Sequence, residues 1–383
     1  MSDSAGDAAL LKRSAPFGLR YQYLSGGVNT GHSWQTWGRG HGSYVSDYIR
    51  ESEAQRIVPV FSYYQLRPSR PGASIDDDTA ADLANLQDPV TMRAYYEDLE
   101  AFFQRASRAR RPVVLQVEPD LWGYVQRNTK HDDASTVPAA VASSGMPDLH
   151  RLPNTVSGFA RAVLALRAKY SPHVIVGYHV SIFGTGKDIL DSHLSDRTTV
   201  RWMAAKAARF YRSLHARYDV LFSELADRDA GYAQVNDGQE LWWDAADFRH
   251  DVQFLTSLHH AVRLPIVLWQ IPVGNTLMRA MNNTPHHFQD NKVQFLLGQG
   301  SRPHLRSYVR AGVTALLFGS GHSEGTCSCD AADDGITNPV PIGGNTLPSL
   351  SADDDGGYFR ARAAAYYKQR VLRLPSRRAG RGR

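Results

Sequence analysis

Cysteine is scarce in this sequence, since Cys327 and Cys329 are the only two in 383 residues. A disulfide across one intervening residue is strained, and two thiols alone lack the paired spacing of a zinc site. We therefore expect two unbridged cysteines in a loop. The alternative is a metal held by both thiols with His322 and Asp330, which stand nearby in the sequence.

Long apolar runs are also absent, and this excludes a membrane-spanning helix. No run approaches the roughly 20 apolar residues that cross a bilayer. Residues 1–16 contain no apolar stretch of the kind found in a signal peptide. We expect this segment to be disordered. The sequence leaves the location open between the cytoplasm and, if a leader has been removed, a secreted or periplasmic site.

Lysine is the third scarce residue, because only seven of the 43 basic residues are lysine and the rest are arginine. We interpret this bias as that of a GC-rich bacterial genome. The net charge of +5 is partly local, since residues 373–383 carry five arginines and no acid. We expect a disordered basic tail, and no binding to nucleic acid or to a membrane.

The sequence has no GxGxxG motif and no P-loop, so a nucleotide-binding sheet is not indicated. Runs typical of strands lie at residues 19–24, 57–65, 112–118, 173–182, 219–224, 265–271 and 313–319. Stretches with helical periodicity lie at residues 94–111, 155–170, 198–218, 244–262, 288–311 and 357–372. This alternation predicts βαβ units and a parallel sheet.

Seven such strands predict an α/β fold, either a (β/α)8-type barrel or a distorted seven-stranded parallel barrel. An eighth strand is not evident, and residues 277–300 are where one could lie. No linker or internal repeat interrupts the chain. We therefore expect residues 17–372 to form one barrel domain.

The run Val114-Leu-Gln-Val-Glu118-Pro-Asp120-Leu-Trp122-Gly123 is the most informative segment. Alternate residues of a strand share a face, so Gln116 and Glu118 are expected to point the same way. Asp120 follows the turn and has a different exposure. Two carboxylates in unlike environments can have different pKa values, as general acid–base catalysis at neutral pH requires. Trp122 offers a flat face suited to a sugar ring.

A second source of carboxylates closes the fifth predicted strand. Glu224 ends that strand, and Asp227, Arg228 and Asp229 follow it. The C-terminal ends of parallel barrel strands and the loops after them build the active site, so Glu224 should lie across the barrel from Glu118. Arg228 could lower the pKa of both aspartates, which suits a base or nucleophile rather than an acid, although a surface salt-bridge turn is equally compatible.

Several aromatic and polar residues complete the predicted substrate site. We expect stacking on sugar rings from the loop tryptophans, while Trp269 lies in mid-strand and can be a core residue instead. The polar residues stand at or after strand ends, where they would bind sugar hydroxyls. These substrate-binding candidates are Trp34, Trp37, Tyr64, Trp122, His179, Trp269, Gln270 and Asn275, together with Asp227 and Asp229.

The segment around Glu118-Pro-Asp120 resembles the Glu-Pro-Asp signature of glycoside hydrolase family 6, the inverting cellulases with a distorted barrel. The resemblance covers about ten of 383 residues. It implies that Asp120, at the position of the family's general acid, protonates the leaving group. Trp122 replaces the small aliphatic residue usual there, and the family's second signature has no upstream counterpart. We take the reaction class from it and not family membership.

The sequence therefore predicts a glycoside hydrolase with Asp120 or Glu118 as acid and Glu224 as base or nucleophile, acting as a monomer without cofactor or metal. One alternative is a metal-dependent hydrolase of esters, amides or phosphates that uses His179, His286 and His287. The other is a barrel that binds a glycan without catalysis.

Overall fold

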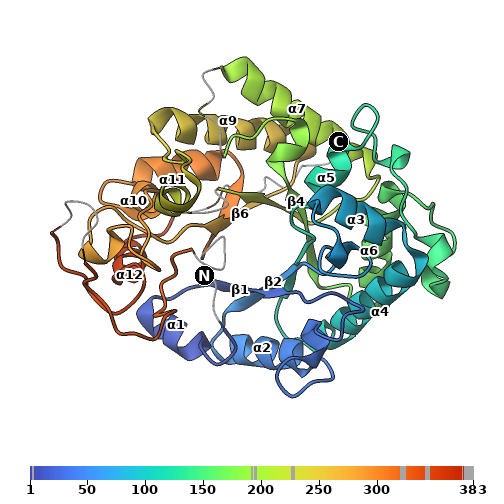
Figure 1. Cartoon of the computed structure of the whole chain (residues 1–383), viewed down its shortest axis with the longest axis horizontal. Helices are drawn as coiled ribbons and strands as arrows, with labels where there is room; N and C mark the ends of the chain where they lie inside the picture. The colour runs from blue at the N-terminus through green and yellow to red at the C-terminus, as the bar shows by residue number, and fades with distance from the viewer. Residues whose placement is uncertain are drawn as a thin grey trace, which may run out of the picture.

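Seven parallel strands form a ring at the centre of the molecule, and helices surround it (Figure 1). The computed structural model describes residues 1, 4–190, 193, 196–225, 229–319, 325–340, 346–372 and 374. The strands pair in sequence order as β1 Leu19–Leu24, β2 Val58–Tyr63, β3 Val114–Val117, β4 Ile175–Val180, β5 Val220–Glu224, β6 Ile266–Ile271 and β7 Val313–Phe318. The predicted seven-stranded parallel barrel is confirmed.

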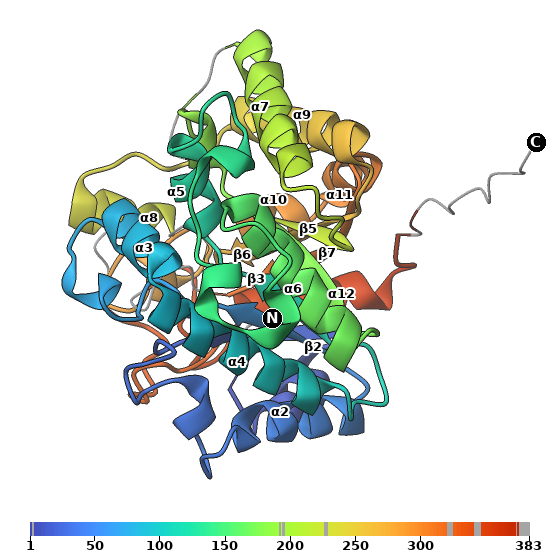
Figure 2. The same ribbon diagram turned by 90° about the vertical axis from the view of Figure 1, so that its right-hand side faces the viewer.

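Helices follow the strands and cover the outside of the ring, as Figure 2 shows from the side. They are α1 Ala8–Ser14, α2 Ser43–Ala54, α3 Asp78–Gln87, α4 Pro89–Ala106, α5 Leu121–Arg127, α6 Val156–Tyr170, α7 Arg197–Ser213, α8 Ala230–Tyr232, α9 Ala245–Val262, α10 Lys292–Leu297, α11 Arg302–Arg310 and α12 Tyr358–Lys368. Local sequence explains several boundaries: α6 begins at the cap Thr155, and α9 begins with a capping box between Asp244 and Asp247.

The sequence predicted the long helices and missed several shorter ones, α2, α3 and α5 among them. The predicted helix over residues 288–311 is two helices, α10 and α11, separated by a turn at Gly298–Ser301. The short helix α5 buries Leu121, Trp122 and Val125 within only two turns, which is too short for a clear 3.6-residue period.

No eighth strand joins the ring among the described residues. Residues 277–300 contain α10 and a 3-10 turn at Arg279–Met281 instead of a strand. At the open seam between β1 and β7, the Tyr21 N–H donates to the Met1 carbonyl at 2.9 Å. An apolar cavity of about 290 Å³ lies along this seam, lined by residues of β1, β7, α11 and α12. The distorted form of the predicted barrel is therefore the one observed.

Both ends of the chain were expected to be disordered. The segment of residues 1–16 contains helix α1, because Ala8 and Leu11 are buried and Glu51 accepts the Gly6 and Ala8 N–H groups at 2.9 and 2.8 Å. Disorder is therefore not what the structure shows there. The basic tail lies outside the described residues, except for Leu374.

The strands bury both faces, as expected of a parallel sheet covered by helices. Outward side chains join the large core beneath the helices. Inward side chains form a separate apolar cluster within the ring, whose buried members are Tyr21, Val60, Val114, Val220, Phe222, Val267, Trp269 and Leu317. This cluster fills the lower part of the barrel and supports the polar residues at the C-terminal ends of the strands.

Gly177 makes room for this cluster, because a Cβ there would lie 2.3 Å from the Phe222 ring. We predict that Gly177→Ala lowers the free energy of unfolding by about 1–3 kcal/mol, the usual cost of overpacking a core. The exposed Gly18 is the matched control, since its added Cβ would meet no atom within 4 Å. Urea unfolding of both variants measures the difference, and equal stabilities would contradict the packing argument.

Candidate active site

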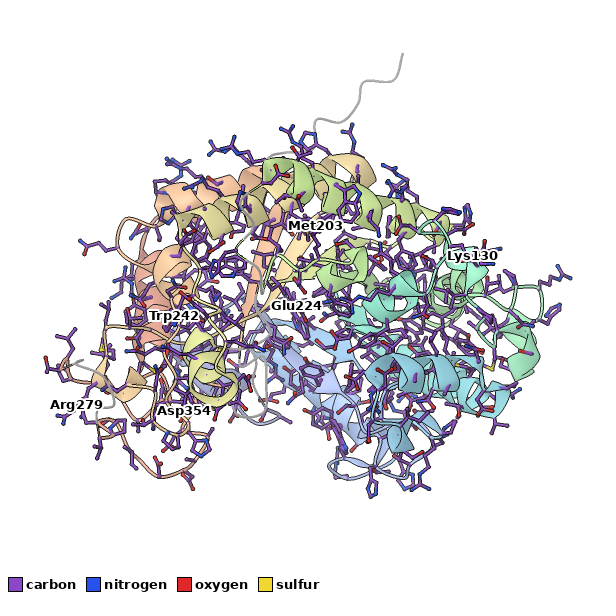
Figure 3. All side chains as sticks on the ribbon, turned by 45° about the horizontal axis from the view of Figure 1, so that its top comes forward. Lys130, Met203, Glu224, Trp242, Arg279 and Asp354 are labelled. Carbon is purple, nitrogen blue, oxygen red and sulfur yellow. A yellow bond between two sulfur atoms is a disulfide. The ribbon has the colours of Figure 1, made fainter. Side chains whose placement is uncertain are left out.

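Polar side chains from four neighbouring strands form a row inside the C-terminal half of the barrel. The Ser62 hydroxyl donates to the Gln116 side-chain oxygen at 2.7 Å, and the Gln116 amide nitrogen lies 2.8 Å from His179 Nδ1. His179 Nε2 lies 3.8 Å from a carboxylate oxygen of Glu224. Figure 3 places Glu224 near the centre of the molecule, far from Arg279 at its periphery.

The sheet register explains why these residues meet. Ser62 pairs directly with Gln116, whereas Gln116 pairs with Gly177, two residues before His179. His179 in turn pairs with Phe222, two residues before Glu224. Side chains two residues apart share a face, so each step from β3 to β5 climbs towards the C-terminal end. The row therefore ends at Glu224, the last residue of β5 and only 8% exposed.

Asp120 lies at the same end of the barrel, on the turn into α5. Its backbone has φ 72° and ψ −44°, an uncommon conformation for a residue with a side chain. The Asp120 carbonyl accepts the N–H groups of Gly123 and Tyr124 at 2.8 and 3.2 Å, which starts the helix. The Asp120 side chain is half-buried. This strained turn carries one of the predicted catalytic carboxylates.

Both predicted catalytic carboxylates affect the pKa of Tyr23, which lies on β1. Burial is the main reason that the pKa of Tyr23 is raised well above its ordinary value, and Tyr21, Asp120 and Glu224 add to the effect. Asp120 and Glu224 therefore both lie within electrostatic reach of the Tyr23 hydroxyl. The Tyr23 ring contacts Tyr64 edge-on and Trp269 at centroid distances of 6.3 and 5.7 Å.

Asp82, on α3, is a site residue that the sequence analysis missed. It is 2% exposed, and one of its oxygens has no hydrogen-bond partner among the described residues. Burial raises the pKa of Asp82 well above its ordinary value, and the neighbouring Asp120 raises it further, against an opposing effect of Arg67. The spacing of Asp78, Asp82 and Asn85 along one helical face was the available signal.

Tyr64 and Tyr124 complete the surroundings of Asp120. The pKa of each phenol is raised above its ordinary value, first by burial and next by the charge of Asp120. Tyr64 was a predicted binding residue and is half-buried, and its position beside Asp120 agrees with that role. The Tyr124 hydroxyl lies 3.3 Å from a carboxylate oxygen of Asp78.

Glu118 does not share the face of Gln116, contrary to the expectation from strand alternation. Its φ of 43° takes it out of strand geometry, so its side chain lies in the wall of the barrel. The buried carboxylate accepts the N–H groups of Gln65 and Leu66 at 3.1 and 3.2 Å, and burial raises its pKa well above the ordinary value. These contacts favour a structural role for Glu118 that ties the turn after β2 to β3.

Three of the four predicted tryptophans are buried. Trp34 donates to the Asp98 carboxylate at 2.7 Å, and Trp122 donates to the Val117 carbonyl at 2.8 Å. Trp269 lies in the apolar cluster within the barrel. The expectation that Trp34 and Trp122 stack on a ligand is wrong because both rings pack beneath the loops. Only Trp37 is partly exposed, with its indole N–H bonded to the His32 carbonyl.

The remaining predicted binding residues are buried or lie outside the described residues. Asn275 bonds to the Asp355 carbonyl at 3.1 Å and accepts the N–H groups of Leu277 and Met278. Asp229 accepts the Thr326 N–H at 2.9 Å, and burial raises its pKa well above the ordinary value. Both residues therefore brace loops. His179 and Gln270 are buried at the barrel end, and Asp227 lies outside the described residues.

The histidines of the metal alternative are not gathered at one place. His179 bonds to Gln116 inside the barrel, whereas His287 bonds through Nδ1 to the Asp354 carbonyl at 3.0 Å. In the described part of the chain, the group of potential metal ligands that lie close together is Cys327, Cys329 and Asp354.

The two cysteines of that group are joined in a disulfide, which corrects the expectation of unbridged thiols. A loop that returns on itself brings the two Cα atoms to 5.3 Å, within the range of a disulfide. His322, the further ligand considered from the sequence, lies outside the described residues.

No family model and no curated protein matches the chain. Its structure is similar to the catalytic domain of a family 26 endo-β-1,4-mannanase from Bacillus sp. JAMB-750, at TM-score 0.48 and 10% identity over 94% of this chain and 78% of that one. A modular family 26 endo-β-1,4-mannanase from Cellulomonas fimi gives 0.49 and 13%, over 93% and 66%. A Thermotoga maritima β-glucosidase gives 0.46 and 9%, over 82% and 76%.

Similarities with TM-scores below 0.5 and identities of at most 13% carry no conclusion about family or substrate. The resemblance to glycoside hydrolase family 6 is not supported by any of these comparisons. The function therefore has to be argued from the site itself.

We predict that Asp82→Asn changes how stability depends on pH. The unfolded carboxyl loses its proton near pH 4, whereas the folded one keeps it to a higher pH because its pKa is raised. Wild type therefore loses stability relative to Asp82→Asn as the pH rises above 4. Urea unfolding at pH 4 and pH 7 measures this. The exposed Asp76→Asn is the control, and a constant difference for Asp82→Asn would refute the burial argument.

Proposed function

We propose that this protein is a glycoside hydrolase whose reacting carboxyl groups are Asp120 and Glu224. The proposal is supported by one observation above all. Both residues lie within electrostatic reach of the Tyr23 hydroxyl, towards the C-terminal ends of the strands, where barrel enzymes build their active sites. Hydrolysis of a glycosidic bond commonly uses two carboxyl groups, one that protonates the leaving oxygen and one that attacks or activates water.

The surroundings of the two groups favour Asp120 as the acid. The buried carboxyl of Asp82 lies close to Asp120, and two neighbouring carboxyl groups do not readily ionise together. The raised pKa of Asp82 means that the pair keeps a proton to a higher pH than an exposed carboxyl group would, and a general acid requires a proton. Glu118 is less suited, because its buried carboxylate already accepts hydrogen bonds from the backbone of Gln65 and Leu66.

Glu224 is then the base or the nucleophile. It ends β5 on the inner face of the barrel, and His179 Nε2 approaches its carboxylate. Tyr23 and Tyr64 supply phenol groups and ring faces within electrostatic reach of the proposed reacting carboxyl groups. We include in the proposal a poly- or oligosaccharide substrate, no cofactor, and action as a monomer in polysaccharide degradation by a bacterium.

No described helix is both long enough and apolar enough to cross a membrane.

We predict that Asp120→Asn and Glu224→Gln each lower kcat by about 10²–10⁴-fold, the usual contribution of one acid–base group. A panel of α- and β-linked glucans, mannans and arabinans identifies the substrate. The anomer released, followed by NMR, shows whether Glu224 attacks directly or activates water. The exposed Glu240→Gln is the matched control and is expected to retain full activity.

Three results would overturn the proposal. Activity that both variants retain would show that other groups carry out the reaction, and loss of activity with a chelator would favour a metal-dependent hydrolase. Binding of a glycan from the panel with no cleavage by wild type would favour a non-catalytic barrel.

A further inference from the structure

His179 was expected to bind a sugar hydroxyl, but its position in the barrel suits another task. The ring is fully buried, with its Nδ1 occupied by the Gln116 amide at 2.8 Å. Its Nε2 has no hydrogen-bond partner among the described residues and lies 3.8 Å from Glu224 Oε1. The Trp269 ring packs edge-on against the imidazole at 5.3 Å. A substrate hydroxyl cannot reach a ring enclosed in this way.

The hydrogen bonds along the row determine which imidazole nitrogen carries the proton. The Ser62 hydroxyl donates to the Gln116 side-chain oxygen at 2.7 Å, so the amide nitrogen of Gln116 faces His179. An amide nitrogen can only donate, and Nδ1 must therefore accept with its lone pair. The proton of the neutral ring then resides on Nε2, on the side of Glu224.

Burial supports the neutral state of this ring. It lowers the pKa of His179 to about 3, so the imidazole carries no charge over the working range of an acid–base enzyme. A protonated ring would also place an N–H at Nδ1 against the Gln116 amide. The dipole of the neutral ring therefore points its positive end, the Nε2–H, towards Glu224.

We propose that His179 is a positioning residue, oriented by Ser62 and Gln116, whose Nε2–H faces Glu224 and keeps that carboxylate ionised and in place. This inference rests on the proposed role of Glu224 as base or nucleophile. At 3.8 Å the contact is between a dipole and a charge, and a small rotation of the carboxylate would close it to a hydrogen bond. A hydrogen bond to the charged form of a carboxyl group favours ionisation.

Other groups also face Glu224 and must be considered in any titration. Among the described residues, these include Tyr23 on β1 and His179 on β4, with Asp120 also within electrostatic reach of the Tyr23 hydroxyl. The phenol and the second carboxyl group both make a negative charge on Glu224 less favourable when they are ionised. Of these groups, only His179 presents a neutral N–H donor in a direction that its own partner fixes.

The first test requires no substrate and uses NMR of the full chain. Ring nitrogen shifts of His179, assigned by their loss in His179→Gln, are expected to show the neutral form with the proton on Nε2. In Gln116→Leu this preference is expected to weaken, because the group that occupies Nδ1 is removed. A proton on Nδ1 in wild type would overturn the proposal.

The second test follows the Glu224 carboxyl carbon, assigned by its loss in Glu224→Gln. We predict that His179→Leu raises the pKa of Glu224 by about one unit, in line with the loss of one hydrogen-bond donor. His179→Gln keeps an N–H near the position of Nε2 and is expected to shift it much less. Tyr178→Phe alters the outer face of the same strand and is the matched control.

An unchanged Glu224 pKa in His179→Leu, or equal shifts in the leucine and glutamine variants, would refute the positioning role. If His179→Leu does not fold, the tautomer in wild type and the titration of His179→Gln and Gln116→Leu still decide the question. Failure of the proposed reaction remains distinguishable, because it would leave these titrations intact. If the reaction is confirmed, the acidic limb of the kcat/KM profile should move to higher pH in His179→Leu.

Discussion

Close packing inside the barrel is the constraint on which the proposed site depends. Phe222 and Trp269 belong to the apolar cluster inside the barrel, where Trp269 packs edge-on against His179, and Gly177 leaves the space that the Phe222 ring occupies. With this apolar layer below them, the polar residues are confined to the C-terminal end of the strands and separated from bulk water. Electrostatic effects between neighbouring groups are stronger in such surroundings than in water. A dipole as small as that of a neutral imidazole can therefore influence Glu224.

The stagger of the strands determines the order in which the polar side chains contact one another above this packed layer. Ser62 and Gln116 are 54 residues apart in the chain, and Gln116 and His179 are 63 apart, yet each pair is in hydrogen-bond contact. Each hydrogen bond connects side chains of adjacent strands. The Ser62 hydroxyl therefore fixes the orientation of the Gln116 amide, and that amide fixes which nitrogen of the His179 ring carries the proton. In the proposed role of His179, the row thus connects the fold to the charge state of Glu224.

The sequence predicted the seven strands and the long helices because their apolar patterns are local. It also placed Asp120 and Glu224 at strand ends, a consequence of parallel topology. It failed where single backbone angles decide the outcome, as at Glu118, whose positive φ turns the side chain into the barrel wall. The burial of Trp34 and Trp122 depends on loops folding over them, which no local pattern reveals. Asp82 was missed because it approaches Asp120 only when α3 packs beside α5.

The two proposed catalytic groups differ in what surrounds them. These surroundings are a stronger argument for their roles than the sequence motif that contains one of them. Asp120 is accompanied by the buried carboxyl of Asp82, whose raised pKa keeps a proton in this pair to a higher pH. Glu224 is approached by an N–H of a neutral ring, which favours negative charge. Opposite environments divide the roles of acid and base between otherwise similar side chains. In the proposed function, the Glu118-Pro-Asp120 motif therefore contributes Asp120 as one reacting group and Glu118 as a structural group, and the second proposed reacting group, Glu224, comes from β5.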